Sequence, residues 1–223
     1  RGSLGSGFKA PTLTELSENA FAGNPDLKPE FTTEYEIGGD LGFFNSRIGI
    51  DAVYYNRVST DQIFAVQIPA STGYIQKVMN AGKITNKGVE LALHGTPVIT
   101  SGGFKWDVGV NYSHNRSEVV ELFTGVESID VGTNFTNFGT VHMIGQPFGV
   151  IQGTVHRRDD EGNLLINSAT GYAMAATELG IIGDPNPDFI SSLINTFRYK
   201  GVNLNLLLEY RQGGDLYSNT IGS

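Results

Sequence analysis

The chain has 223 residues, a formal net charge of −8 and no cysteine. The acidic balance argues against a nucleic-acid-binding protein, which needs a basic stripe, and the lack of Cys removes disulfides and thiolate metal sites. No apolar run approaches the roughly 20 residues that a transmembrane helix needs. The composition instead includes 29 Gly, 13 Phe and 9 Tyr, which favours β-structure with many turns.

Alternation of apolar and polar residues predicts strands along the chain. In residues 33–41 the two faces read Tyr35, Ile37 and Leu41 against Glu34, Glu36 and Asp40. The same alternation recurs in residues 47–58, 88–95, 104–113, 189–200 and 202–211. Together with a partial strand at the start, we expect about seven strands.

The connections between these strands alternate between short and long. Short turns fall at residues 44–46, 96–103 and 200–201, and long segments at residues 10–31, 59–83 and 121–188. All-β meanders with their long loops at one end are typical of outer-membrane barrels, whereas sandwiches have loops at both ends. Several strands reach about 10 residues, which suits a tilted membrane strand.

Aromatic residues gather at the expected short-turn end, where an interfacial girdle of a barrel lies: Phe43, Phe44, Phe104, Trp106, Phe197 and Tyr199. Alternation by itself also fits a soluble antiparallel sheet with one buried face. The loop asymmetry and the aromatic placement favour the antiparallel up-and-down transmembrane β-barrel. Residues 12–20 carry the main helical signal, with Thr12 or Thr14 as the cap.

No catalytic, cofactor or metal site is predicted. His94, His114, His142 and His156 are dispersed and lack ligand spacing, so we expect them to be polar residues of the lumen or the loops. The segment RRDDEGN (residues 157–163) lacks the full spacing of a calcium loop, and a hairpin turn through Glu161, Gly162 and Asn163 fits better.

The strand carboxylates are expected to face a polar lumen. There they would meet the basic residues Arg47, Lys105 and Arg211, or water, or a plug. These carboxylates are Glu34, Glu36, Asp40, Asp51, Glu90 and Asp107. Aromatic and amide residues of the loops could stack on and hydrogen-bond a glycan, but any barrel carries such residues, so the substrate-binding residues stay unknown: Tyr74, Gln76, Phe135, Asn137 and Phe138.

Three motifs carry a family resemblance. GSGFKAPTLTEL (residues 5–16), GNPDLKPEFTTEYEIG (residues 23–38) and NAGKITNKGVELAL (residues 80–93) resemble, in order and spacing, motifs of TonB-dependent outer-membrane receptors. IPASTGY (residues 68–74), IGQPFGVIQG, NPDFISSLINTFRYKG and EYRQGGDLYSNT are similar to the SusC/RagA branch. The resemblance is weakest in residues 128–143 and 163–182, which we interpret as variable extracellular loop.

The resemblance implies a 22-stranded barrel with an internal plug, in the bacterial outer membrane. It implies active import of a large nutrient, a glycan or a peptide, powered by the TonB–ExbB–ExbD complex and assisted by a SusD-like surface lipoprotein. Residues 1–223 would be part of this single barrel domain, with the plug, the N-terminus and the final strands outside the sequence. It implies contact with membrane lipid, no nucleic acid, no cofactor and no enzymatic activity. The alternatives are a passive porin or structural envelope barrel and, further off, a soluble β-rich protein.

Overall fold

A curved antiparallel sheet forms the wall of the protein. The structure is a computed structural model that describes residues 2–12, 24–68, 70–135 and 138–218. The sheet has seven strands in the order β1-β2-β3-β6-β7-β12-β13, as predicted: β1 (Gly2–Lys9), β2 (Glu30–Phe43), β3 (Ile48–Thr60), β6 (Gly82–Ile99), β7 (Phe104–Leu122), β12 (Pro187–Tyr199) and β13 (Val202–Gly213). The helix expected at residues 12–20 lies almost wholly outside the described residues.

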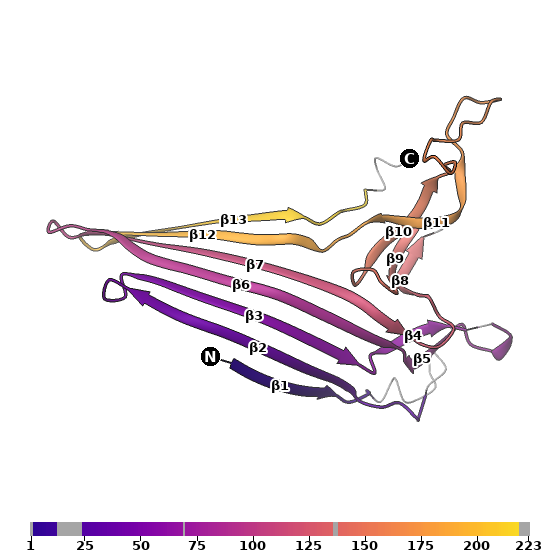
Figure 1. Cartoon of the computed structure of the whole chain (residues 1–223), viewed down its shortest axis with the longest axis horizontal. Coiled ribbons are helices and arrows are strands. Elements are labelled where there is room, and N and C mark those ends of the chain that lie inside the picture. Colours follow the sequence, from indigo (N-terminus) through magenta and orange to yellow (C-terminus); the bar gives the residue numbers. More distant parts are fainter. Residues whose placement is uncertain (1, 13–23, 69, 136–137, 219–223) are drawn as a thin grey trace.

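The loop asymmetry is confirmed. The turns β2–β3, β6–β7 and β12–β13 lie together at one end of the wall, and the long segments lie at the other (Figure 1). Lys200 and Gly201 close the β12–β13 hairpin with positive φ angles of 44° and 87°, the combination that a tight type I′ turn requires. The sheet therefore runs up and down, as a membrane barrel does.

A second group of strands, which we call the loop layer, stands on the long-loop end of the wall. It contains the hairpin β4 (Ile63–Gln67) and β5 (Gln76–Asn80), with the 3₁₀ helix η1 (Ala70–Thr72) between them. A four-stranded sheet, ordered β11-β10-β9-β8, completes it: β8 (Ser128–Phe135), β9 (Phe138–Met143), β10 (Val150–His156) and β11 (Ala175–Gly183). The interpretation of residues 128–143 and 163–182 as variable loop thus missed regular strands.

The pairing register defines the two faces of the wall. Residues opposite each other share a face, and one row reads Leu41, Ile50, Leu93, Val110, Leu193 and Leu208. The adjacent row, on the other face, reads Asp40, Asp51, Ala92, Asn111, Ser192 and Glu209. The predicted apolar and polar faces are therefore continuous across neighbouring strands.

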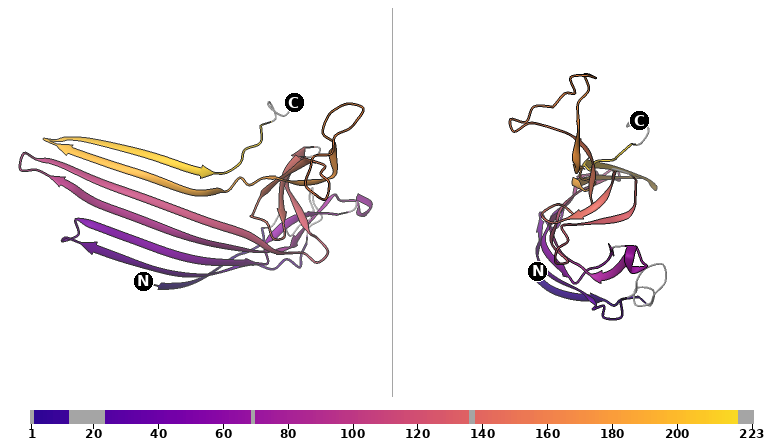
Figure 2. Two further views of the ribbon diagram at one scale, coloured as in Figure 1. Left: turned by 45° about the horizontal axis from the view of Figure 1, so that its top comes forward. Right: turned by 90° about the vertical axis from the view of Figure 1, so that its right-hand side faces the viewer.

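The polar face is the concave one. Seen along the strands, the wall is an arc with the β4–β5 hairpin on its inner side (Figure 2). Val66 of β4 packs there against Val119 of β7. Val119 is paired with Ile84, Ile84 with Ser59 and Ser59 with Thr32. Val119 therefore lies on the same face of the wall as Thr32 and Glu34. The convex face carries Tyr35, Ile37 and Leu41, which are 61%, 67% and 59% exposed.

The hydrophobic core lies in the loop layer and at its junction with the wall. Its main cluster comprises Val66, Ala81, Val119, Leu122 and Ile129. The wall has no comparable interior, and β13 is exposed at all of its positions. Among the described residues, no helix is long and apolar enough to cross a membrane.

Candidate functional site: the concave face and the rim of the wall

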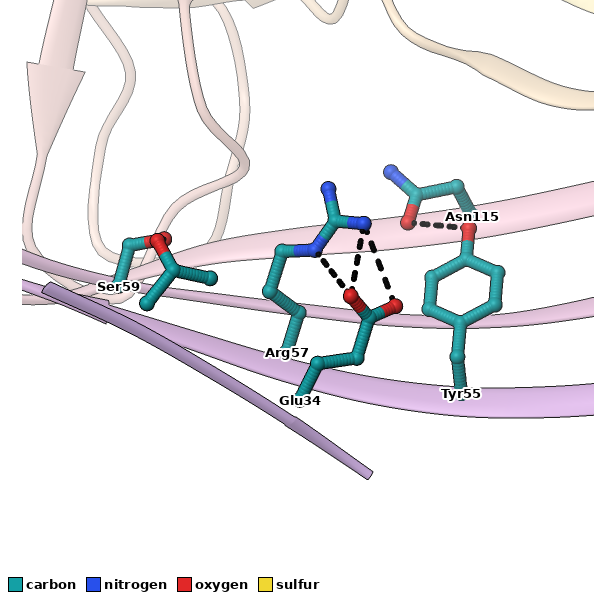
Figure 3. A network of polar contacts seen from close by, with 6 residues as sticks. Glu34, Tyr55, Arg57, Ser59 and Asn115 are labelled. Atoms are coloured by element: carbon teal, nitrogen blue, oxygen red, sulfur yellow. Dashed lines mark hydrogen bonds and ion pairs between the residues drawn. The ribbon is translucent and has the colours of Figure 1, made fainter. Parts of the chain in front are cut away.

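An ion pair joins β2 and β3 on the upper concave face. Arg57 Nε donates to Glu34 Oε2 over 3.1 Å, and Arg57 Nη2 donates to Oε1 and Oε2 over 3.2 and 3.0 Å (Figure 3). The two residues are directly opposite in the register, and a planar guanidinium matches a carboxylate in this geometry. The contact holds both side chains upright on the inner surface.

Tyr55 and Asn115 continue this polar surface towards β7. The Tyr55 hydroxyl donates to Asn115 Oδ1 over 3.0 Å (Figure 3). Asn115 Nδ2 in turn donates to Asn86 Oδ1 over 3.4 Å. The Tyr55 ring lies across Gly88, where a Cβ would overlap it. A polar hollow of about 420 Å³ is lined by these residues together with the Glu34–Arg57 pair, Glu36 and Glu90. The hollow offers acceptors and donors to hydroxyl, amide or cationic groups.

A second charged cluster lies on the concave face near the short turns. Asp107 accepts hydrogen bonds from Arg198 Nη1 at 2.7 Å and Thr96 Oγ1 at 2.6 Å, and Lys105 Nζ lies 3.0 Å from its carboxylate. The register brings Lys105 opposite Arg198 and Asp107 opposite Thr196. The predicted contact between Asp107 and Lys105 is confirmed.

Arg47 and Arg211 donate hydrogen bonds to backbone carbonyl oxygens. Arg47 precedes β3 in the turn, and its Nη2 donates to the carbonyl oxygen of Thr96 over 3.1 Å. Arg211 Nη2 donates to the carbonyl oxygen of Pro185 over 2.9 Å. The carboxylate partners are instead Arg57 and Arg198, which sequence reasoning missed because strand alternation gives a face but not a cross-strand register.

Two of the sequence motifs meet at the rim of the wall, on the side of the long loops. The side-chain amide of Asn80 accepts from the Lys28 amide N–H and donates to the Lys28 carbonyl oxygen, both over 2.8 Å. Asn80 Nδ2 also donates to the Asp61 carbonyl oxygen over 2.8 Å, and Glu30 Oε1 accepts from the Ile63 N–H over 2.9 Å. Asn80, in the NAGKI motif, therefore clamps the NPDLKPE segment to the base of the β4–β5 hairpin across 52 residues of sequence.

A second seam ties the loop layer to β7 and β13. Phe148 N–H donates to Ser117 Oγ over 3.0 Å, and Asn186 Nδ2 donates to the Phe148 carbonyl oxygen over 3.0 Å. Further along, Asp184 N–H donates to Asp215 Oδ2 over 2.8 Å. The segments around Phe148, Asn186 and Asp215 carry the resemblance to the SusC/RagA branch. Hydrogen bonds join them along the boundary between the loop layer and the wall.

The four histidines take different environments. His94 Nδ1 lies 3.6 Å from Asp51 on the concave face, and His156 is exposed in β10. His114 pairs with Val89 on the convex side of the wall, with Nδ1 against the Asp188 carbonyl oxygen, so it lies outside the expected lumen. His142 lies in β9 of the loop layer, and it is buried there, only 3% exposed.

His142 forms an aromatic stack in the loop layer. Its ring lies 3.9 Å from the Phe148 ring and 5.1 Å from the Phe64 ring, measured between centroids. Its buried Nδ1 has no hydrogen-bond partner within the described residues. Burial lowers the pKa of His142 from 6.5 to about 4, because removal from water disfavours the charged imidazolium. His142 is therefore neutral at pH 7 and acts as packing.

The hairpin turn in RRDDEGN is confirmed. Asp159 Oδ1 accepts from the N–H groups of Glu161 and Asn163 at 3.0 and 2.8 Å. The side chain of Asn163 and these backbone groups lower the pKa of Asp159. Since the carboxylate is engaged by N–H donors, it is not arranged as a calcium ligand. In the part of the chain that the structure describes, no group of three His, Cys, Asp or Glu residues could hold a metal ion.

Three of the loop residues considered for substrate contact lie in the described part of the chain, Tyr74, Gln76 and Phe138. Phe138 stacks on Tyr217 with centroids 3.7 Å apart. Tyr74 and Gln76 belong to the β4–β5 hairpin and are half-buried. Asn137 and the side chain of Phe135 lie outside the described residues.

The fold and these inner-face networks can be compared with known proteins. The family profile described as TonB dependent receptor-like, beta-barrel matches residues 1–210. The chain belongs to this family. It is a family of TonB-dependent receptors rather than enzymes, and membership places the wall in the bacterial outer membrane, with the convex face towards lipid and the concave face towards the lumen.

Several relatives of this receptor segment are known. It is 28% identical over 221 residues to TonB-dependent receptor P3 of Formosa agariphila, covering 89% of this chain and 22% of that protein. It is 27% identical over 200 residues to the TonB-dependent receptor SusC of Bacteroides thetaiotaomicron, covering 83% of this chain and 20% of SusC. The chain thus spans about a fifth of the length of the curated relatives.

A solved structure confirms the fold. The RagAB peptide transporter superposes with a TM-score of 0.70 at 22% identity, covering 95% of this chain and 24% of the transporter chain. At this level of identity the likeness concerns the arrangement of strands. It confirms that the open sheet has the architecture of a TonB-dependent barrel wall.

Proposed function

We propose that this chain forms barrel wall and extracellular loops of a receptor that imports a large nutrient, a glycan or a peptide, with energy from TonB. The observation that carries the proposal is the family match over residues 1–210. The face assignment supports it, since an apolar convex row and a charged, hydrogen-bonded concave row are what a wide, wet barrel needs. The wall itself performs no chemistry; it encloses the route and presents the loops.

The wall requires further strands. β1 and β13 stand at the two edges of the sheet, and their outer backbone groups need partners inside a lipid bilayer. A barrel of about 22 strands leaves room for a plugged lumen. We infer that residues 1–223 are one part of this single barrel domain, and that the polar hollow bordered by Glu34, Tyr55 and Glu90 faces its interior.

Partners follow from the same proposal. A SusD-like surface lipoprotein would cap the loop layer, since the chain is similar to SusC and to the RagAB transporter. The TonB–ExbB–ExbD complex would act on the plug side and not on this segment. The relatives leave both cargo classes open, because RagAB is a peptide transporter whereas the SusC/RagA resemblance includes glycan importers.

Uptake by whole cells tests the proposal. A strain lacking the gene is complemented with the full-length receptor, and growth is measured on defined oligosaccharides or oligopeptides as the limiting nutrient. We expect growth on one class to require both the receptor and TonB. Growth that requires the receptor but persists without TonB would assign the barrel to passive diffusion instead.

A further inference from the structure

An apolar groove opens on the convex face of the wall near the short turns. Its volume is about 470 Å³, and the side chains that line it are largely apolar: Phe44, Ile48, Leu93, Pro97, Val108 and Val110. Ile48 and Leu93 are 44% and 46% exposed there. In the folded barrel this groove opens towards the hydrocarbon of the membrane.

The register fixes this orientation. Leu93 and Val110 belong to the same row as Leu41, and Ile48 is directly opposite both Phe43 and Gly95. These rows alternate with the row of Asp40 and Asp51, which faces the lumen. The groove is therefore distinct from the polar inner surface and takes no part in the proposed import route.

The recess is built into the backbone. Gly95 lies at its base, and a Cβ there would stand 3.3 Å from the Arg47 carbonyl oxygen and 3.8 Å from Ile48 Cγ1. β6 carries one extra residue between Gly95 and Val98 relative to β7, a bulge that contains Pro97. The hollow therefore does not depend on the rotamer of one side chain.

Arg47 supplies a cation at the border of the groove. Its Nη2 donates to the Thr96 carbonyl oxygen over 3.1 Å, which engages one of the five N–H donors of a guanidinium. Within the described residues Arg47 makes no ion pair with a carboxylate. A guanidinium with free donors beside an apolar slot matches an amphiphile with an anionic phosphate head.

The position of the groove along the strands determines which leaflet of the membrane it faces. The groove is lined by Phe44 of the β2–β3 turn. This turn lies at the opposite end of the wall from the loop layer (Figure 1). Trp106 and Phe197 stack nearby, 5.8 Å apart between centroids, as aromatic residues do at membrane interfaces. Since the long loops are extracellular, this is the periplasmic interface, where glycerophospholipids are the amphiphiles at hand.

We propose that the groove between β3 and β7 binds one acyl chain of an anionic glycerophospholipid of the periplasmic leaflet, with the lipid phosphate on Arg47. The proposal goes beyond nutrient import and depends only on the location of the barrel in the outer membrane. Bound lipid fills the recess at Gly95 and neutralises the guanidinium.

Lipid retention by the full-length receptor tests the site. The delipidated receptor in mild detergent is titrated with phosphatidylglycerol, and bound lipid is counted by native mass spectrometry, with phosphatidylcholine as the zwitterionic comparison. We expect one retained phosphatidylglycerol, its loss in Val108→Phe, which fills the groove, and about tenfold weaker binding in Arg47→Gln. Equal retention by parent and both variants would overturn the proposal.

Val202→Phe is the matched control. Val202 is on the same face and at the same end, 69% exposed and outside the groove, so lipid retention should not change. An equal loss in this variant would show non-specific lipid contact and also overturn the site. If Val108→Phe fails the heat-modifiability test for a folded barrel, crosslinking replaces it, with a phosphatidylglycerol that carries a photoreactive acyl chain. The proposal requires crosslinks on residues 93–97 or 108–110 of the parent receptor, and weaker crosslinks in Arg47→Gln. Crosslinks elsewhere would overturn it.

Discussion

The wall and the loop layer are stabilised in different ways. In the loop layer and at its junction with β7 of the wall, Val141, Val150 and Val119 are 1%, 1% and 0% exposed, as in the core of a soluble domain. In the wall, β13 is exposed along its whole length, and Leu207 and Leu208 remain 65% and 63% exposed. The wall therefore relies on backbone pairing and on its surroundings, lipid outside and polar contents inside. The loop layer is instead held by a hydrophobic core that it shares with the end of β7.

Among the substitutions considered, Val119→Asp should have the largest effect on stability. It places a charge in the packed cluster with Val66 and Ile129, which should destabilise the loop layer by more than about 4 kcal/mol. We expect rapid protease cleavage in the loop layer of the full-length receptor, while the wall keeps its heat-modifiable migration. Val131→Asp, at a position 36% exposed, should leave the cleavage pattern unchanged; equal sensitivity of both variants would contradict this shared core.

Leu193→Arg tests the wall. Leu193 lies on the convex row between Val110 and Leu208, and a cation facing mid-bilayer lipid should reduce the stability of the barrel by about 2–4 kcal/mol. Ser192→Arg, one residue away on the lumen face, should change it far less. The measurement is unfolding by denaturant in lipid bilayers, and equal losses would mean that the faces are assigned wrongly.

The pH dependence of the loop layer gives the smallest effect. The folded pKa of His142 is lowered to about 4, so the unfolded chain binds the proton more tightly. The contribution of neutral His142 is present above about pH 6.5 and is lost as the pH falls towards 4, by at most about 3 kcal/mol. Proteolysis of the loop layer should accelerate over this range, and His142→Phe should flatten the profile. A variant with the parent's profile would rule out His142 as the cause.

Strand alternation predicted the wall well because each strand has one apolar and one polar face. It predicted the ends less well: residues 88–95 turned out to be the middle of β6 (Gly82–Ile99). At the loop-layer end, residues such as Ile84 face a protein core, and a bulge interrupts the alternation at Lys83. A second bulge interrupts it at Gly95, near the short turns. Alternation distinguishes a lipid-facing from a lumen-facing side chain, so it no longer predicts strands where side chains pack against the loop layer.

The inner-face networks were harder to predict. Glu34 was assigned to the polar face, but its partner Arg57 follows from a pairing register that a single sequence does not contain. His142 was expected among polar residues of the lumen or the loops because the four histidines are dispersed and lack ligand spacing. Its burial depends on Phe64 and Phe148, which lie 78 and six residues away in the chain. Long-range packing decided both cases.

The Asn80 clamp has a consequence for how this part of the receptor can vary. Asn80 binds the backbone of Lys28 and of Asp61, and Gln62 pairs through its backbone with Gly82 and Ala81. The β4–β5 hairpin is thus closed at its base before it leaves the wall. Its tip around η1 can be lengthened, shortened or exchanged without altering the strand register below. The hydrogen bonds at the rim hold the base of the hairpin in place, so its tip is the part that is free to differ between receptors.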